Sequence, residues 1–154
     1  MIKRKDLLIV SLLRKNARET LTNMSKTIKM PISTIYDKLK SNEGGLIKKH
    51  TTLLDFSKIG FNTRASMLLR IKKSTRAQAR EYLLKHQNIN NVYKINNGYD
   101  FLVEVVFRHI REVEEFIEAI EEKFEIDAKE VYYLIDEIKR EAFMSDPTLI
   151  HLVS

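Results

Sequence analysis

The sequence predicts an α+β protein in which a mostly helical first part precedes a second part that alternates strands and helices. Apolar residues recur at helical spacing up to residue 39, which is typical of amphipathic helices. A Gly-Gly pair then ends that pattern, because glycine adopts the left-handed conformation at little cost. After residue 63, β-like runs are separated by two amphipathic stretches. We therefore expect two small domains, residues 1–62 and residues 63–154.

The first part is expected to contain three helices, which lie at about residues 5–15, 20–28 and 31–42. Asp6 suits the N-cap or first turn of the first helix, and Thr20 and Thr22 are candidate caps of the second. Pro31 suits the start of the third helix, where its missing N–H has no partner to lose. The order predicts a three-helix unit with a tight turn before its last helix.

The third helix and the segment after it complete this layout. Ile32, Ile35 and Leu39 are expected to form the buried face of the helix. Residues 46–61 are short and β-like, so we expect a two-stranded wing that leads into a short connection. Helix, helix, tight turn, helix and wing is the layout of a winged helix-turn-helix.

The second part is predicted to follow the order βαββαβ, which is the ferredoxin-like split motif. Its strands are expected at residues 65–71, 92–95, 101–107 and 131–138, and its helices at residues 75–86 and about 113–124. Asn96, Asn97 and Gly98 are strong turn residues between two of the β runs.

Charge is divided unevenly between the two parts. Residues 1–62 contain 13 Lys and Arg against 5 Asp and Glu, whereas residues 63–154 contain 14 against 16. A basic domain attracts polyanions by releasing their counterions. An α-helix fits the major groove of DNA, and the exposed residues near its start reach the base edges. The predicted DNA-contacting residues are Ser33, Thr34, Tyr36, Lys38 and Lys40 in the third helix, with Lys48 and Lys49 in the wing.

Several short motifs together resemble the Lrp/AsnC family of transcriptional regulators over nearly the whole chain. They are residues 6–13, 16–18, 33–40 and 45–47 in the first part, and residues 98–101 and 136–139 in the second. The family usually has Gly where this chain has Lys29. A left-handed residue other than glycine costs roughly 1–2 kcal/mol, so the turn is expected to be reshaped here.

We expect a homodimer or larger even-numbered assembly that is built mainly through residues 63–154 and reads a palindromic DNA site through its two-fold symmetry. Apolar strand residues also favour an interface, since they exceed what one small sheet needs; they are Val103, Val105, Phe107, Val131, Tyr133 and Ile135. Family members often bind a free amino acid near the turn that corresponds to Gly98, Tyr99 and Asp100. Asp100 either accepts the ammonium group of such an effector or caps the turn by bonding to backbone.

Two other functions match parts of the sequence less well. An RNA-binding domain shares the βαββαβ order, and residues 98–103 resemble its third-strand motif, but Asp100 would repel phosphate and residues 67–71 offer no aromatic ring. An enzyme is not expected, because the four His residues lack metal-ligand spacing and no nucleophile motif is present. The chain has no cysteine and no apolar run long enough to span a membrane. We expect a cytoplasmic protein without a cofactor or metal.

Overall fold

The structure is a computed structural model that describes residues 1–153, and the chain forms two compact units in it. The helical unit comprises Met1–Leu53 and residues 138–153, and the sheet unit comprises Leu54–Glu137. We expected the division after residue 62 and the C-terminal residues in the second part. The connection instead packs with the sheet unit, and the C-terminal segment packs with the helical unit. The chain therefore passes between the units twice.

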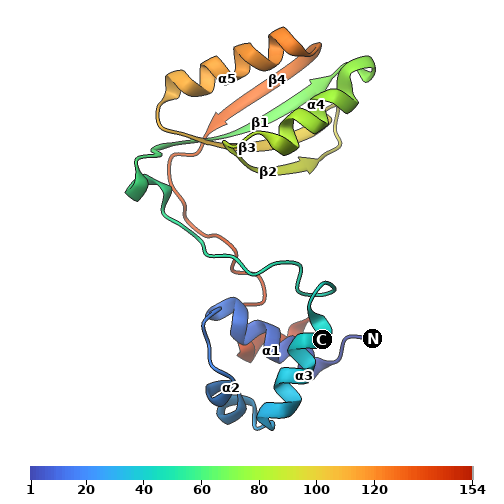
Figure 1. Cartoon of the computed structure of the whole chain (residues 1–154), viewed down its shortest axis with the longest axis vertical. Coiled ribbons are helices and arrows are strands. Elements are labelled where there is room, and N and C mark those ends of the chain that lie inside the picture. The colour runs from blue at the N-terminus through green and yellow to red at the C-terminus, as the bar shows by residue number, and fades with distance from the viewer. Residues whose placement is uncertain (154) are drawn as a thin grey trace. The chain divides into compact units, whose positions relative to one another are not determined.

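The helical unit contains the three expected helices, α1 (Arg4–Lys15), α2 (Leu21–Ile28) and α3 (Ile32–Asn42), as Figure 1 shows. The Thr20 hydroxyl caps α2 by accepting the Asn23 backbone N–H at 3.1 Å. One apolar cluster holds the helices together, and its buried members are Ile9, Leu12, Met24, Met30 and Ile35. The predicted helices are confirmed.

The turn between α2 and α3 keeps a tight shape despite the absence of glycine. Lys29 is left-handed, with φ of 51° and ψ of 53°, and its N–H bonds to the Ser25 carbonyl oxygen. The Ser25 hydroxyl donates to the Met30 carbonyl oxygen at 2.6 Å, and Met30 is buried. These contacts offset the roughly 1–2 kcal/mol cost of the left-handed residue. The turn is strained rather than reshaped.

The expectation of a two-stranded wing at residues 46–61 is wrong. This segment contains no strand, only an isolated bridge between Glu43 and Ile47 and the short 3-10 helix Phe56–Ile59. Residues 48–55 are all exposed, so no apolar side chain among them anchors a hairpin to the core. An isolated hairpin without such packing is marginal in water. Lys48 and Lys49 therefore lie on an extended, irregular segment.

The sheet unit has the predicted ferredoxin-like order. Its elements are β1 (Thr63–Ile71), α4 (Lys73–Lys85), β2 (Ile89–Lys94), β3 (Phe101–Phe107), α5 (Ile110–Lys123) and β4 (Ile126–Tyr133). The strands pair antiparallel in the order β2-β3-β1-β4. The bounds predicted for the last strand were wrong, since β4 ends at Tyr133 and Ile135 beyond it is 98% exposed. Residues 126–130 of this edge strand include Asp127, Lys129 and Glu130, so the apolar pattern was too weak for a strand to be predicted there.

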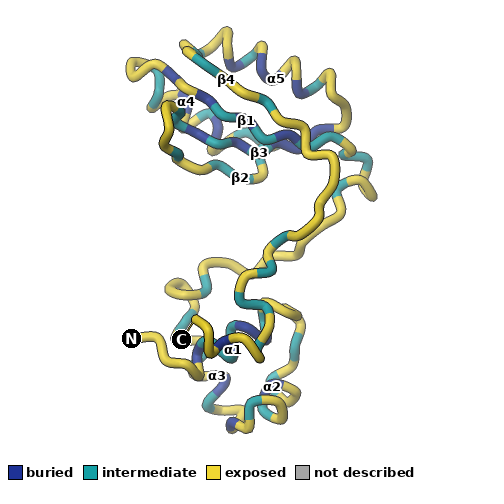
Figure 2. Tube along the Cα trace, turned by 180° about the vertical axis from the view of Figure 1, so that it is seen from behind, coloured by how far each residue is buried: buried dark blue, intermediate teal, exposed yellow. Residues whose placement is uncertain are grey.

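Both helices cover the same face of the sheet. The core between them contains buried residues of β1, β3, α4 and α5 (Figure 2). Val103, Val105 and Phe107 are buried there, so these three of the six residues that we expected at an interface pack within the unit instead. The other face, which we call the open face, is not covered by either helix of the sheet unit. It carries a row of Tyr93, Leu102, Leu68 and Glu130, and a second row of Asn91, Glu104, Ser66 and Tyr132.

The C-terminal segment packs on α1, which the sequence analysis missed. Its 3-10 helix Pro147–Leu152 contacts α1 and buries Ile150. The Arg14 guanidinium donates to the carbonyl oxygens of Phe143, at 2.6 Å, and Glu141, at 2.9 Å. The segment therefore contributes to the fold of the helical unit.

We predict that Ile150→Ala destabilises the helical unit by about 2–4 kcal/mol, because it leaves a cavity beside α1. Leu149→Ala is the matched control: its side chain is 50% exposed, so its loss should change the stability by less than about 0.5 kcal/mol. Amide hydrogen exchange of α1 in the full chain measures the opening free energy. Equal effects of the two substitutions would contradict this role of the segment.

Candidate nucleic-acid interface

The side of α3 that faces away from the core is exposed and carries both polar and apolar residues. Ile35 is fully buried and Leu39 packs against the same core, so the opposite side of the helix faces solvent. The exposed residues form two rows with a spacing of four, Ile32, Tyr36 and Lys40 in one and Ser33, Asp37 and Ser41 in the other. We call these six residues the outer face of α3.

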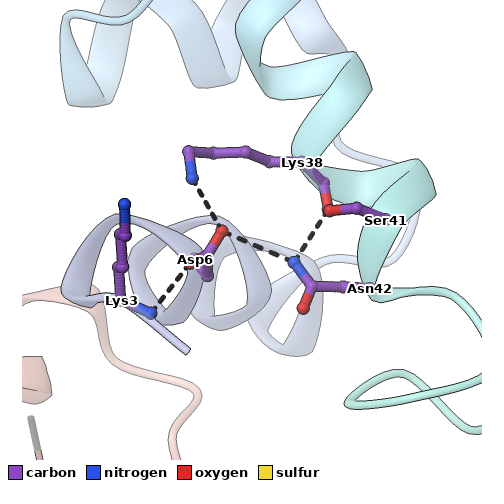
Figure 3. A network of polar contacts seen from close by, with 5 residues as sticks. All are labelled: Lys3, Asp6, Lys38, Ser41 and Asn42. Atoms are coloured by element: carbon purple, nitrogen blue, oxygen red, sulfur yellow. Dashed lines mark hydrogen bonds and ion pairs between the residues drawn. The ribbon is translucent and has the colours of Figure 1, made fainter. Parts of the chain in front are cut away.

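A polar network fixes the orientation of α3 against α1 (Figure 3). Asp6 of α1 is only 8% exposed, and its Oδ1 lies 2.9 Å from Lys38 Nζ. Its Oδ2 accepts the backbone N–H of Lys3 at 2.9 Å. Asn42 Nδ2 donates to the Lys38 carbonyl oxygen at 2.8 Å and lies 3.5 Å from Asp6 Oδ1. Each oxygen of this buried carboxylate therefore has a donor.

The network keeps Asp6 ionised. Burial acts to raise the pKa of Asp6, but the hydrogen bonds from Lys38 and from the Lys3 backbone outweigh it, and the pKa is lowered. The Lys38 ammonium therefore pairs with Asp6 and is directed toward α1 rather than toward solvent. The prediction that Lys38 contacts DNA does not fit this placement, and Thr34 is also only half-exposed.

The other residues predicted in α3 lie on its outer face. Ser33, Tyr36 and Lys40 are exposed, and Lys40 Nζ lies 5.9 Å from the centre of the Tyr36 ring. Ile32 was expected to be buried, but its side chain is 45% exposed. Pro31 is the N-cap, so the helix begins at Ile32, before the apolar stripe reaches the core. The sequence signal for this was the position of Pro31.

Exposed basic residues precede and follow α3 along the chain. The helical unit has 14 Lys and Arg against 6 Asp and Glu, counted over residues 1–53 and 138–154. Lys26 and Lys29 are exposed before α3, and Lys48 and Lys49 are exposed after it. Within residues 1–153, no helix is long and apolar enough to cross a membrane, and no His, Asp or Glu cluster is placed to hold a metal ion.

The predicted effector residues lie at a turn of the sheet unit, and Asp100 has a structural role there. Its Oδ2 accepts the Ile71 backbone N–H at 2.7 Å, and its Oδ1 lies 3.3 Å from Arg76 Nε. Arg76 also donates to the Ile71 carbonyl oxygen at 3.0 Å. Gly98 is left-handed, with φ of 83°, as the turn requires. Asp100 thus joins the turn to the end of β1.

Tyr99 connects the same turn to β4. Its hydroxyl donates to Glu130 Oε1 at 3.0 Å, and the Tyr132 hydroxyl donates to Glu130 Oε2. These hydrogen bonds to a carboxylate raise the pKa of both tyrosines. Glu130 was not predicted from the sequence, because only the pairing of β4 with β1 brings it close to the turn.

Comparison with known proteins finds relatives that span most of the chain. The HTH-type transcriptional regulator FL11 of Pyrococcus abyssi is 28% identical over 116 residues, which are 75% of this chain and 77% of the relative. The FL11 regulator of Pyrococcus furiosus has the same identity and coverage. No protein-family model matches the chain.

Solved structures share the fold at lower identity. The transcriptional regulator NMB0573 of Neisseria meningitidis, solved as an L-Met complex, is 18% identical with a TM-score of 0.82 and covers 91% of this chain and 94% of its own. LrpC of B. subtilis is 20% identical with a TM-score of 0.81, covering 90% and 98%. AsnC of E. coli is 18% identical with a TM-score of 0.79, covering 91% and 96%.

We predict that Asp6→Asn destabilises the helical unit at pH 7 by about 1–3 kcal/mol, because it leaves Lys38 without its ionic partner. The pKa of Asp6 is lowered in the folded protein, so its contribution is complete above the ordinary value of 3.8 and disappears as the pH falls through the folded-state value. Thermal unfolding followed by circular dichroism should show a smaller difference from wild type at pH 2 than at pH 7. The exposed Asp37→Asn is the control, and an equal loss in both variants would contradict the network.

We also predict that two lysine substitutions in α3 differ in effect, one lowering stability and the other lowering affinity for DNA. Lys38→Met should lower the unfolding midpoint, because Asp6 then lies buried without a cation. Lys40→Met should leave the midpoint within a few degrees of wild type and weaken binding to any duplex, because an exposed cation beside DNA neutralises phosphate. Paired melting and DNA titrations measure this. The assignment is wrong if Lys38→Met keeps wild-type stability and only Lys40→Met unfolds the unit.

Proposed function

We propose that this chain, which resembles the Lrp/AsnC family of transcriptional regulators in sequence and fold, binds double-stranded DNA through the outer face of α3. The resemblance predicted from sequence motifs is confirmed by the relatives and by the solved regulators. One observation carries the proposal: an 11-residue helix presents two exposed rows of side chains from the most basic part of the molecule. A helix of this kind fits the major groove.

The exposed side chains divide into two roles in this proposal. Ser33 and Tyr36 lie near the start of α3, where residues of a recognition helix reach base edges. Lys40, Lys48 and Lys49 contact phosphates, which set position and affinity without reading sequence. The irregular segment after α3 takes the place of the wing that the sequence analysis expected.

Assembly through a second copy of the chain is part of the proposal. The open face of the sheet leaves Tyr93 and Tyr132 each 53% exposed, beside the half-buried Leu68 and Leu102. Pairing two such faces would cover these side chains, and a two-fold axis would present two copies of α3 to a palindromic site. In this proposal the open face takes the place of Val103, Val105 and Phe107, which were expected at the interface and are buried in the core.

A free amino acid remains the proposed effector, and the structure changes which residue is suited to hold it. One solved regulator of the same fold is an L-Met complex. Asp100 already bonds to Ile71 and Arg76, so it is poorly placed to accept an ammonium group. Glu130 also accepts hydrogen bonds, from the Tyr99 and Tyr132 hydroxyls, but it is exposed, whereas Asp100 is half-buried and faces the cation of Arg76. An exposed carboxylate can accept further hydrogen bonds from an ammonium group. Gly98 allows close approach of backbone N–H groups to a carboxylate.

We predict that the full chain binds duplex DNA with an affinity that falls steeply with salt. Each neutralised phosphate adds about −0.9 to the slope of log K against log salt concentration. Lys48→Ala and Lys49→Ala should each reduce the slope by about one and weaken all sequences alike, whereas Ser33→Ala should change the preferred sequence. Titration of labelled duplexes at several salt concentrations, and selection from random DNA, measure these effects. A salt-independent affinity, or tighter binding to RNA than to DNA, would contradict the proposal.

A further inference from the structure

We infer that Ile32 and Tyr36 form an apolar pair that contacts the 5-methyl groups of thymine in the major groove. The inference rests on the proposed DNA binding by α3, and it names the base that the first two turns of this helix recognise. Ile32 was assigned to the protein core from the sequence, and only its exposure in the structure makes it available for this contact.

The two side chains are exposed and adjacent. Ile32 is 45% exposed and Tyr36 is 52% exposed, whereas Ile35 on the inner side of the same helix is fully buried. Residues four apart on a helix are surface neighbours, so the pair forms one apolar strip on the first two turns. Neither side chain belongs to the apolar cluster of the helical unit. Folding of the unit therefore leaves this strip uncovered.

The charge around the strip favours a duplex as its occupant. Lys40 continues the row of Ile32 and Tyr36, and Lys29 is exposed on the turn that precedes α3. Cations that flank an apolar strip match the two components of a groove, since phosphates line its edges and bases form its floor. The 5-methyl group of thymine is the apolar group among the base edges in the major groove.

Asp37 indicates which part of the duplex the strip faces. It lies in the neighbouring row, between Ser33 and Ser41, and its carboxylate is exposed. A carboxylate at this place would be repelled by phosphate oxygens, so the middle of the outer face does not suit the DNA backbone. A carboxylate is compatible with base edges, where amino groups can donate to it. The strip beside Asp37 therefore faces bases rather than phosphates.

The test removes one methyl group at a time. A duplex selected from random DNA by the full chain is remade with deoxyuridine in place of each thymine in turn, which deletes only the 5-methyl group. Burial of one methyl group corresponds to about a threefold to fivefold change in affinity. We expect a loss of this size at one or two thymines and no change at the others.

Substitutions then assign the loss to the strip. Ile32→Ala should bind the thymine duplex and the corresponding uracil duplex equally well. Tyr36→Phe should keep the wild-type ratio and Tyr36→Ala should lose it at its own thymine. The matched control is Leu53→Ala, which removes a 49% exposed apolar side chain of the same unit outside α3 and should keep every ratio. Unchanged circular dichroism of each variant establishes that it is folded.

The outcomes separate this inference from the proposed function. If wild type binds a selected duplex but no uracil replacement weakens binding, or if Ile32→Ala and Tyr36→Ala keep the wild-type ratios, the methyl contact is overturned while DNA binding stands. A selected site without thymine overturns it in the same way. If wild type selects and binds no duplex, the proposed function fails and the inference fails with it.

Discussion

The ion pair between Asp6 of α1 and Lys38 of α3 sets the orientation on which the proposed interface depends. It acts together with Ile35, which is buried on the inner side of α3, so that the helix has one preferred rotation about its axis. Successive helix residues are about 100° apart, so a shift by one position would replace the outer face with a different set of side chains. A buried charge also requires its partner, which makes the arrangement specific as well as stable.

The two units differ in charge and in what they leave uncovered. The helical unit is basic and leaves one side of α3 exposed, while α4 and α5 of the sheet unit cover only one face of their sheet. The chain leaves the helical unit at Leu53 and returns at Ile138. At the start of the returning segment, Arg64 Nη1 lies 2.9 Å from Glu137 Oε2. Farther along it, Arg14 donates a hydrogen bond to the Phe143 carbonyl oxygen. This segment connects β4, which carries Glu130, to the C-terminal residues that pack on α1.

Local signals in the sequence were sufficient for most of the fold. Pro31, the Thr20 cap and the apolar spacing predicted the three helices, and the Asn-Asn-Gly turn predicted the pairing of β2 with β3. Features that depend on contacts between distant residues were not predictable in this way. Examples are the ion pair of Lys38 with Asp6, 32 positions away, and the hydrogen bond from Tyr99 to Glu130. The wing was predicted from β-like residues alone, but no core lies beneath them to hold a hairpin.

The central claim is that the outer face of α3 lies against DNA. Amide hydrogen exchange at single-residue resolution, measured on the full chain with and without a bound duplex, tests it most directly. The account predicts slower exchange in the first turns of α3 and in residues 46–50 when DNA is bound, with the strands of the sheet unit unchanged. Slower exchange confined to β1, β3 and β4, with α3 unaffected, would contradict the account and place the nucleic acid on the open face.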